Sequence, residues 1–138
     1  MLSRITIYCD GGSRGNPGEA SYGFAIVKND EVIYEEGKRI GFATNNVAEY
    51  SAVVGAFRYL LTYPDIKYDE IQFLLDSMLV VNQMNGLWKI KNESLRELLY
   101  TAKSFQQELN KKVTFTAIPR EKNTLADRQV NLALDNKI

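Results

Sequence analysis

Hydrophobic and polar residues alternate along the first forty positions of the chain, with the period of two that is typical of strands. The pattern predicts a first strand over residues 4–9, ended by a glycine-rich turn at 10–12. Two more strands are predicted, over residues 20–28 and about 31–41, with a tight turn at Asn29-Asp30 between them. The N-terminal part is therefore expected to be a three-stranded meander.

After this meander the period changes to that of helices. A first helix is predicted from Asn46 until Pro64 stops it. Ser94 and Glu97 have capping-box spacing near the start of a later helix. The other predicted elements are a strand over 71–75, a helix over 77–85, a helix over 93–109, a strand over about 113–118 and a helix over 124–135. The order predicts an α/β fold, in which a five-stranded mixed sheet combines an antiparallel meander with two crossover strands and is flanked by helices.

Length and composition indicate one ordinary globular domain spanning residues 1–138. Hydrophobic residues make up 45% of the chain and charged residues 25%, enough apolar material for a core. The N-terminal residues lack the apolar stretch of a signal peptide, and no later apolar run approaches the ~20 residues of a membrane span. Cys9 has no second cysteine to pair with. We therefore expect no membrane partner and a reducing, cytoplasmic location.

The candidate chemistry lies in four carboxylates, each in its own local motif: Asp10, Glu49, Asp76 and Asp127. The predicted elements place Asp10 at a strand end, Glu49 in the first turn of a helix and Asp76 at a strand-to-helix junction. The chain contains no histidine, which excludes imidazole zinc sites and histidine general bases. A divalent metal held by carboxylates is the chemistry that remains most economical.

Each acid also has a structural explanation when it is taken singly. Asp10 can begin a turn, Glu49 can complement a helix dipole, Asp76 can cap a helix, and Asp127 can form a capping box with Thr124. Acids at the same end of neighbouring strands, however, repel one another strongly unless a cation binds between them. The four together therefore favour a metal site.

The net charge of zero, from 17 basic and 17 acidic side chains, argues at first against a nucleic-acid partner. Two divalent ions at the four carboxylates would change this balance, leaving 13 acidic against 17 basic side chains. Several of the basic residues flank the motifs, although solvated surface charge explains any one of them equally well.

Four segments, in this order and spacing, resemble the type 1 ribonuclease H family: residues 10–18, 44–50, 76–92 and 119–127. The resemblance covers essentially the whole chain. It implies a ribonuclease H-like fold and endonucleolytic hydrolysis of the RNA strand of RNA–DNA hybrids, leaving 5′-phosphate and 3′-hydroxyl ends. It also implies that the four carboxylates are catalytic ligands of two Mg²⁺ ions, with Mn²⁺ as an alternative.

The same resemblance implies a set of substrate-binding residues: Gly11, Gly12 and Ser13 through close backbone approach; Asn16, Asn46 and Gln83 as groove-contacting amides; Thr44 and Asn92 at a phosphate of the DNA strand; and Trp88 against a deoxyribose. Simpler roles stay open. Asn16 precedes a proline and suits a turn, Asn46 suits a helix cap, and Trp88 suits a hydrophobic lid between two helices.

One feature departs from the family pattern. Many relatives have a histidine in the loop before the last carboxylate, whereas this loop reads Pro119-Arg120-Glu121-Lys122-Asn123. Either Arg120 or Glu121 is a candidate to replace it. The alternatives to hybrid cleavage are a catalytically weak or silent duplex-binding module on the same fold, a nuclease that also cuts double-stranded RNA, and acids that serve merely as caps. We expect a monomer with an RNA–DNA hybrid as partner and no obligate protein partner.

Overall fold

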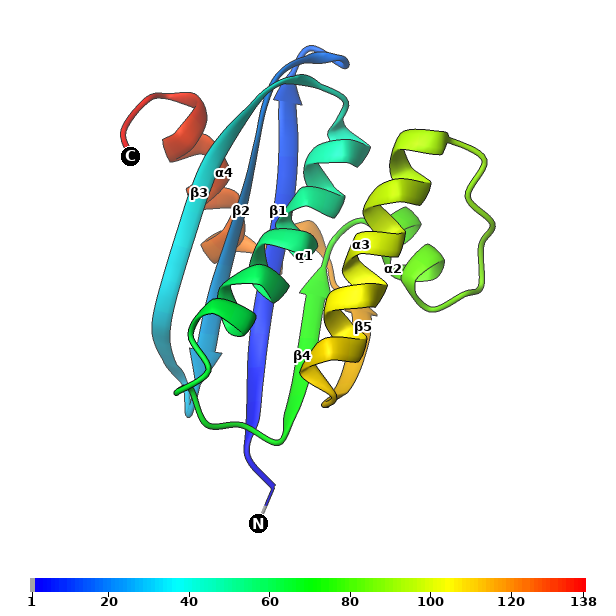
Figure 1. Cartoon of the computed structure of the whole chain (residues 1–138). Coiled ribbons are helices and arrows are strands. Elements are labelled where there is room, and N and C mark those ends of the chain that lie inside the picture. Colours follow the sequence, from blue (N-terminus) through cyan, green and yellow to red (C-terminus); the bar gives the residue numbers. More distant parts are fainter. Residues whose placement is uncertain (1) are drawn as a thin grey trace.

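The structure is a computed structural model and describes residues 2–138 (Figure 1). Its elements follow the predicted order, with one short 3₁₀ turn, Arg120–Lys122, added before the last helix. In chain order they are β1 Arg4–Arg14, β2 Gly18–Lys28, β3 Glu31–Ala43, α1 Asn45–Thr62, β4 Glu70–Leu75, α2 Met78–Met84, α3 Glu93–Leu109, β5 Lys112–Ala117 and α4 Thr124–Leu134.

The five strands form one mixed sheet in the order β3-β2-β1-β4-β5. The first three pair antiparallel as a meander, while β4 pairs parallel with both β1 and β5. The hairpin between β2 and β3 turns at Asn29 and Asp30, whose φ angles of 53° and 62° are those of a type I′ turn. The predicted fold class is confirmed.

Helices cover both faces of the sheet. Helices α1 and α3 lie side by side over one face, and α4 packs behind the meander on the other face (Figure 1). The core between α1 and the sheet is the larger, because β1, β2 and β4 all direct apolar side chains into it. The largest fully buried side chains are Tyr50, Phe24, Phe57, Phe73, Ile5, Ile7, Ile26, Leu60, Ile71, Leu75, Met84 and Val53.

The predicted turn at residues 10–12 is wrong, because β1 continues through it to Arg14. Strand β2 pairs with β1 as far as Arg14↔Glu19, so the glycines belong to a strand. Gly11 serves a different purpose: a Cβ there would lie 2.2 Å from the backbone carbon of Ala48 in α1. The glycine therefore allows α1 to approach β1 closely.

A second glycine has the same effect on the opposite face of the sheet. Gly23 of β2 is paired with Asp10, and a Cβ at this position would lie 2.6 Å from the backbone oxygen of Ala126 in α4. Side chains alternate between the two faces of a strand. Asp10 therefore points toward α4, whereas Gly11 faces α1.

The helix starts differ from the prediction in detail. Helix α1 begins one residue early at Asn45, with Thr44 as its cap, so Glu49 lies in the second turn rather than the first. Helix α3 is capped by Asn92 instead of by the predicted box, because the Asn92 side chain accepts a hydrogen bond from the Leu95 N–H (3.1 Å). In both helices the side-chain oxygen of the cap accepts a hydrogen bond from a first-turn N–H that has no partner within the helix.

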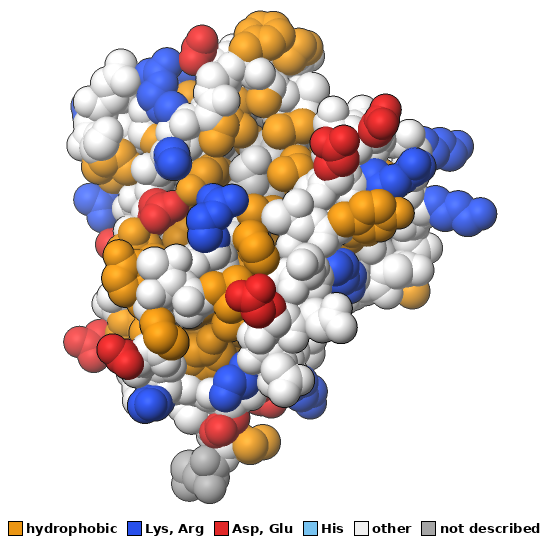
Figure 2. All heavy atoms as spheres, in the orientation of Figure 1, with side chains coloured by type: hydrophobic (Ala, Val, Ile, Leu, Met, Phe, Trp, Pro, Cys, Tyr) orange, Lys and Arg blue, Asp and Glu red, His pale blue; other side chains and the backbone are white. Residues whose placement is uncertain are grey.

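The exposed surface carries one basic projection. The segment between α2 and α3 stands away from the sheet, and Figure 2 shows Lys and Arg side chains at this side of the molecule. Its exposed residues include Lys89 and Lys91. Among the residues that the structure describes, no helix combines the length and the apolar character needed to cross a membrane.

We predict that Gly11→Ala lowers the free energy of unfolding by about 2–3 kcal/mol, because the new methyl group overlaps the α1 backbone. Gly12→Ala is the matched control, since its Cβ would meet Val130 Cγ1 at an ordinary 3.6 Å. Its free energy of unfolding should stay within about 1 kcal/mol of the wild-type value. Denaturant titration measures both, and equal effects of the two substitutions would contradict the close-approach role of Gly11.

Candidate active site

The pairing of β1 with β4 brings two acids together. The last parallel pair is Cys9↔Leu75, so Asp10 and Asp76 are the next residues on adjacent strands. Strand β4 ends there, while β1 continues with β2 as its remaining neighbour. The edge of β1 is therefore open beside Asp10, and side chains from both faces of the sheet can meet at this opening.

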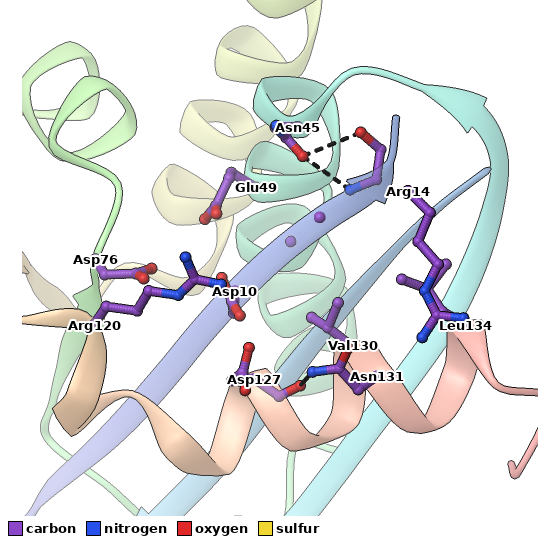
Figure 3. A pocket seen from close by; sticks show the side chains of 13 residues that line it. Asp10, Arg14, Asn45, Glu49, Asp76, Arg120, Asp127, Val130, Asn131 and Leu134 are labelled. Atoms are coloured by element: carbon purple, nitrogen blue, oxygen red, sulfur yellow. Dashed lines mark hydrogen bonds between the residues drawn. The ribbon is translucent and has the colours of Figure 1, made fainter. Parts of the chain in front are cut away.

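Glu49 reaches the opening from α1. One carboxylate oxygen from each of Asp10, Glu49 and Asp76 lies within 4.8 Å of the other two, a spacing that suits a shared cation. Figure 3 shows the three carboxylates pointing toward one another, with Asp127 of α4 approaching from the other side.

The four acids border one open cavity of about 440 Å³. Asp127 lines it from the first turn of α4, which Gly23 allows to lie close to the sheet. The other lining residues are Gly11, Gly12, Ser13, Arg14, Asn45, Arg120, Val130, Asn131 and Leu134. Elements from both faces and both halves of the chain thus contribute to one site.

The carboxylates are under electrostatic stress in the absence of a cation. Asp10 and Glu49 are only 8% and 9% exposed. Burial, followed by the charge of Asp76, raises the pKa of Asp10 to about 7. Burial and then the charges of Asp10 and Asp76 raise the pKa of Glu49 well above its usual range. Desolvation and like-charge repulsion both favour the protonated forms of this pair.

A divalent cation would remove this stress. Oxygen Oε2 of Glu49 is buried and has no hydrogen-bond partner within the described residues 2–138, so it is free to act as a ligand. The donors are all carboxylate oxygens, which suit Mg²⁺ or Mn²⁺ better than softer metals. The residues therefore fit the predicted divalent metal.

Comparisons with known proteins show the family of the chain. A sequence profile for a family described as "Reverse transcriptase-like" matches residues 8–133. RNase H1 from the halophilic archaeon Halobacterium salinarum has 36% sequence identity in a structural alignment with a TM-score of 0.88, which covers 96% of this chain and 98% of that one. The chain belongs to the type 1 ribonuclease H family.

Two further relatives define the extent of this ribonuclease H similarity. LC11-RNase H1, whose structure was solved in complex with an RNA/DNA hybrid, aligns with a TM-score of 0.90 and 38% identity over 96% of this chain and 98% of its own. A curated "bifunctional protein" of Mycobacterium tuberculosis is 39% identical over 96% of this chain. The chain spans 36% of the length of that mycobacterial relative.

The cavity that the four acids line is bordered on one side by a hydrogen-bond network between β1 and α1. The Oδ1 atom of Asn45 accepts hydrogen bonds from the Ser13 N–H (2.9 Å) and hydroxyl (3.1 Å). The Asn45 N–H in turn donates to Oδ1 of Asn16 (3.0 Å), which is exposed. Of the predicted substrate-binding residues, Gly11, Gly12 and Ser13 line the cavity, while Asn16 supports it from outside.

The other predicted substrate-binding residues are not among those that line the cavity. Asn46 is exposed at the start of α1, and Thr44 uses its hydroxyl to accept from the Val47 N–H (3.2 Å). Asn92 caps α3, and Trp88 is 48% exposed on the projecting segment.

Gln83 lies in the interior of the protein, between helices. Its side chain is buried, accepts a hydrogen bond from the Tyr50 hydroxyl (2.6 Å) and donates a longer one to the Lys89 carbonyl (3.4 Å). The amide ties α2 to α1 and to the projecting segment, and its expected groove contact stays a prediction. The apolar helical pattern around Gln83 leaves room for a buried amide, which periodicity alone cannot distinguish from an exposed one.

Three polar cavity residues were not predicted as site residues: Arg14, Asn45 and Asn131. Asn131 follows Asp127 by four residues, and this helix spacing places both on the same face of α4. Asn45 stands between two residues that were selected from the same motif. Arg14 is one of the basic residues that flank the motifs, and the continuation of β1 brings it to the cavity, where it forms an ion pair with Asp135 (2.6 Å).

Arg120 and Glu121, the two candidates to replace the family's loop histidine, differ in their position relative to the cavity. Arg120 lines the cavity, and Figure 3 shows its side chain extending from the 3₁₀ turn toward the carboxylates. Glu121 is exposed and is not among the cavity residues. The geometry therefore favours Arg120.

We predict that Asp10→Asn stabilises the metal-free protein at high pH. The folded state holds a proton on Asp10 up to a pKa of about 7, whereas the unfolded chain releases it near 3.8. Binding of this proton therefore stabilises the folded state fully below pH 4, and the stabilisation is lost as the pH rises through 7. Because Asn cannot ionise, the Tm of the Asp10→Asn variant should exceed the wild-type Tm by about 4 °C or more at pH 8.

Thermal melts in EDTA between pH 4 and pH 8 measure this difference, which should shrink toward zero at pH 4. A saturating divalent metal should reduce or reverse it at pH 8, because the metal stabilises the wild type through the same carboxylates. A Tm difference independent of pH in EDTA would contradict the repulsion among the acids.

Proposed function

We propose that this chain hydrolyses the RNA strand of RNA–DNA hybrids, leaving 5′-phosphate and 3′-hydroxyl ends. The observation that carries the proposal is the convergence of Asp10, Glu49 and Asp76 within 4.8 Å beside a cavity that Asp127 also lines. The hybrid bound in the structure of LC11-RNase H1 supports the choice of substrate class. A phosphodiester backbone running past the cavity mouth would bring one phosphate to the four acids.

The carboxylates would divide into two overlapping ligand sets. Both Asp76 and Asp127 act electrostatically on Asp10, which supports Asp10 as the residue shared between two ions. Glu49 and Asp76 would complete one set and Asp127 the other. Two Mg²⁺ ions bound there would supply activation of the attacking water and stabilisation of the leaving oxygen.

The cavity wall formed by Gly11, Gly12, Ser13 and Asn45 would align the RNA strand. Gly11, Gly12 and Ser13 follow Asp10 along β1 and line the cavity, and the Asn45 side chain holds Ser13 in place by accepting a hydrogen bond from its N–H. Because Asn45 Oδ1 already accepts two hydrogen bonds from Ser13, its Nδ2 group is the part that can contact a 2′-hydroxyl. This assigns the 2′-hydroxyl sensing to Asn45 more directly than to Asn46.

The DNA strand would lie toward the projecting segment. Trp88 offers an exposed aromatic face for a deoxyribose, and Lys89 and Lys91 offer charges for phosphates. Thr44 and Asn92 cap the N-termini of α1 and α3, where N–H groups favour phosphate. This part of the affinity would depend on salt but not on sequence.

The test is cleavage of a labelled RNA–DNA hybrid with Mg²⁺, Mn²⁺ or EDTA. The wild type should cut only the RNA strand and only with metal. Asp10→Asn should lose more than about 10³-fold in rate, because it removes the charge shared by both ligand sets.

Matched double-stranded RNA and DNA substrates distinguish the alternatives. Equal cutting of double-stranded RNA would extend the function to a broader nuclease. Tight hybrid binding without cutting by any metal would contradict the proposal and indicate a silent binding module.

We predict that Arg120→Ala lowers the cleavage rate about 10²-fold, because it removes a positive charge directed at the place where negative charge develops. A guanidinium offers five N–H donors and no acceptor, so Arg120 would act through its charge and its hydrogen bonds. Glu121→Ala is the neighbouring control and should stay within about twofold of the wild type. Single-turnover rates at saturating hybrid measure both, and a larger loss from Glu121→Ala would reverse the assignment.

A further inference from the structure

We propose that Asn123 is a positioning residue for the acidic site, which fixes Asp76 and Asp127 relative to Asp10. The inference rests on the proposed function, in which the four acids act together on bound metal. Asn123 lies immediately before α4 and is only 1% exposed, the most deeply buried of the amide side chains in the described part of the chain.

The Asn123 side chain joins the two strands that carry Asp10 and Asp76. Its Nδ2 group donates a hydrogen bond of 2.8 Å to the carbonyl oxygen of Cys9, the residue directly before Asp10. The same Nδ2 group donates a longer hydrogen bond of 3.4 Å to Oδ1 of Asp76. One amide therefore spans the point at which β1 and β4 separate.

The Asn123 backbone connects this bridge to the fourth acid. Its carbonyl oxygen accepts a hydrogen bond from the Asp127 N–H (3.1 Å), and this bond closes the first turn of α4. Its own N–H donates to the Arg120 carbonyl (3.0 Å) and closes the 3₁₀ turn. Asn123 is thus linked to Asp76 directly, to Asp10 through Cys9, and to Asp127 through the helix backbone.

Helix capping does not explain an asparagine at this position. Asn is favoured at helix starts because its side-chain oxygen accepts from a backbone N–H of the first turn. Here Asn123 makes no such bond, and its Oδ1 is buried without a partner in the part of the chain that the structure describes. A buried acceptor without a partner costs stability, so the favourable contacts of this side chain are those of its Nδ2 group.

The bridge should matter most when metal binds. Ligand carboxylates are effective only in the correct orientation, and hydrogen bonds from neighbouring residues set that orientation. Without the bridge, Asp76 can rotate and α4 can shift along the sheet. The residue would therefore affect metal affinity more than folding.

The test compares Asn123→Ala and Asn123→Ser with a matched control, Gln129→Ala. Gln129 is also a buried amide of α4, but it donates to Glu35 on β3 (3.1 Å), away from the four acids. Serine can cap α4 but is too short to span both strands, so Asn123→Ser keeps the test valid if the alanine variant does not fold. Calorimetric titration with Mn²⁺ and thermal melts with and without Mn²⁺ are measured for all proteins, followed by hybrid cleavage.

We expect both Asn123 variants to bind Mn²⁺ about 10–100-fold more weakly and to lose most of the metal-induced rise in Tm, with cleavage partly recovered at higher Mn²⁺ concentration. Gln129→Ala should lower Tm in EDTA but keep the wild-type Mn²⁺ affinity. If the Asn123 variants lower Tm but bind Mn²⁺ as the wild type does, Asn123 is a structural residue and the inference falls.

The two proposals fail in different ways. Weakened Mn²⁺ binding by the Asn123 variants, with no hybrid cleavage by the wild type, would overturn the proposed function and support the positioning role. Metal-dependent hybrid cleavage by the wild type that the Asn123 substitutions leave unchanged, with unchanged Mn²⁺ affinity, would do the reverse.

Discussion

The register between β1 and β4 is the constraint on which the site depends. Because Cys9 pairs with Leu75 and β4 then ends, Asp10 and Asp76 become neighbours at an open edge of the sheet. The antiparallel partner β2 keeps β1 extended past this point, so Asp10 is held on a strand rather than on a mobile turn. A shift of one residue in the parallel register would turn Asp76 to the other face and separate the acids.

Close packing of two helices on β1 and β2 completes the constellation. Gly11 lets α1 deliver Glu49 from one face, and Gly23 lets α4 deliver Asp127 from the other. The two helices lie on opposite faces of the sheet, and both Glu49 and Asp127 border the cavity at its open edge. This arrangement explains why residues from distant parts of the chain converge on one cavity of about 440 Å³.

The site opposes the stability of the fold that supports it. Buried carboxylates that raise one another's pKa destabilise the metal-free protein at neutral pH, and the unpaired Glu49 oxygen adds to this cost. The aromatic and aliphatic core between α1 and the sheet offsets the cost. Strain of this kind at a ligand site is expected where the bound ligand, here a divalent cation, restores the balance.

The sequence by itself determined the order of the elements, the mixed sheet and the identity of the four acids. Periodicity reports burial of one face, and the type I′ turn at Asn29-Asp30 follows from residues that tolerate positive φ. Tertiary structure alone decided the continuation of β1, the burial of Gln83, the inclusion of Asn45 and the bridging position of Asn123. The physical reason is that local patterns specify which residues prefer a strand, a helix or the interior, whereas contacts across the sheet depend on register and on how closely helices can approach.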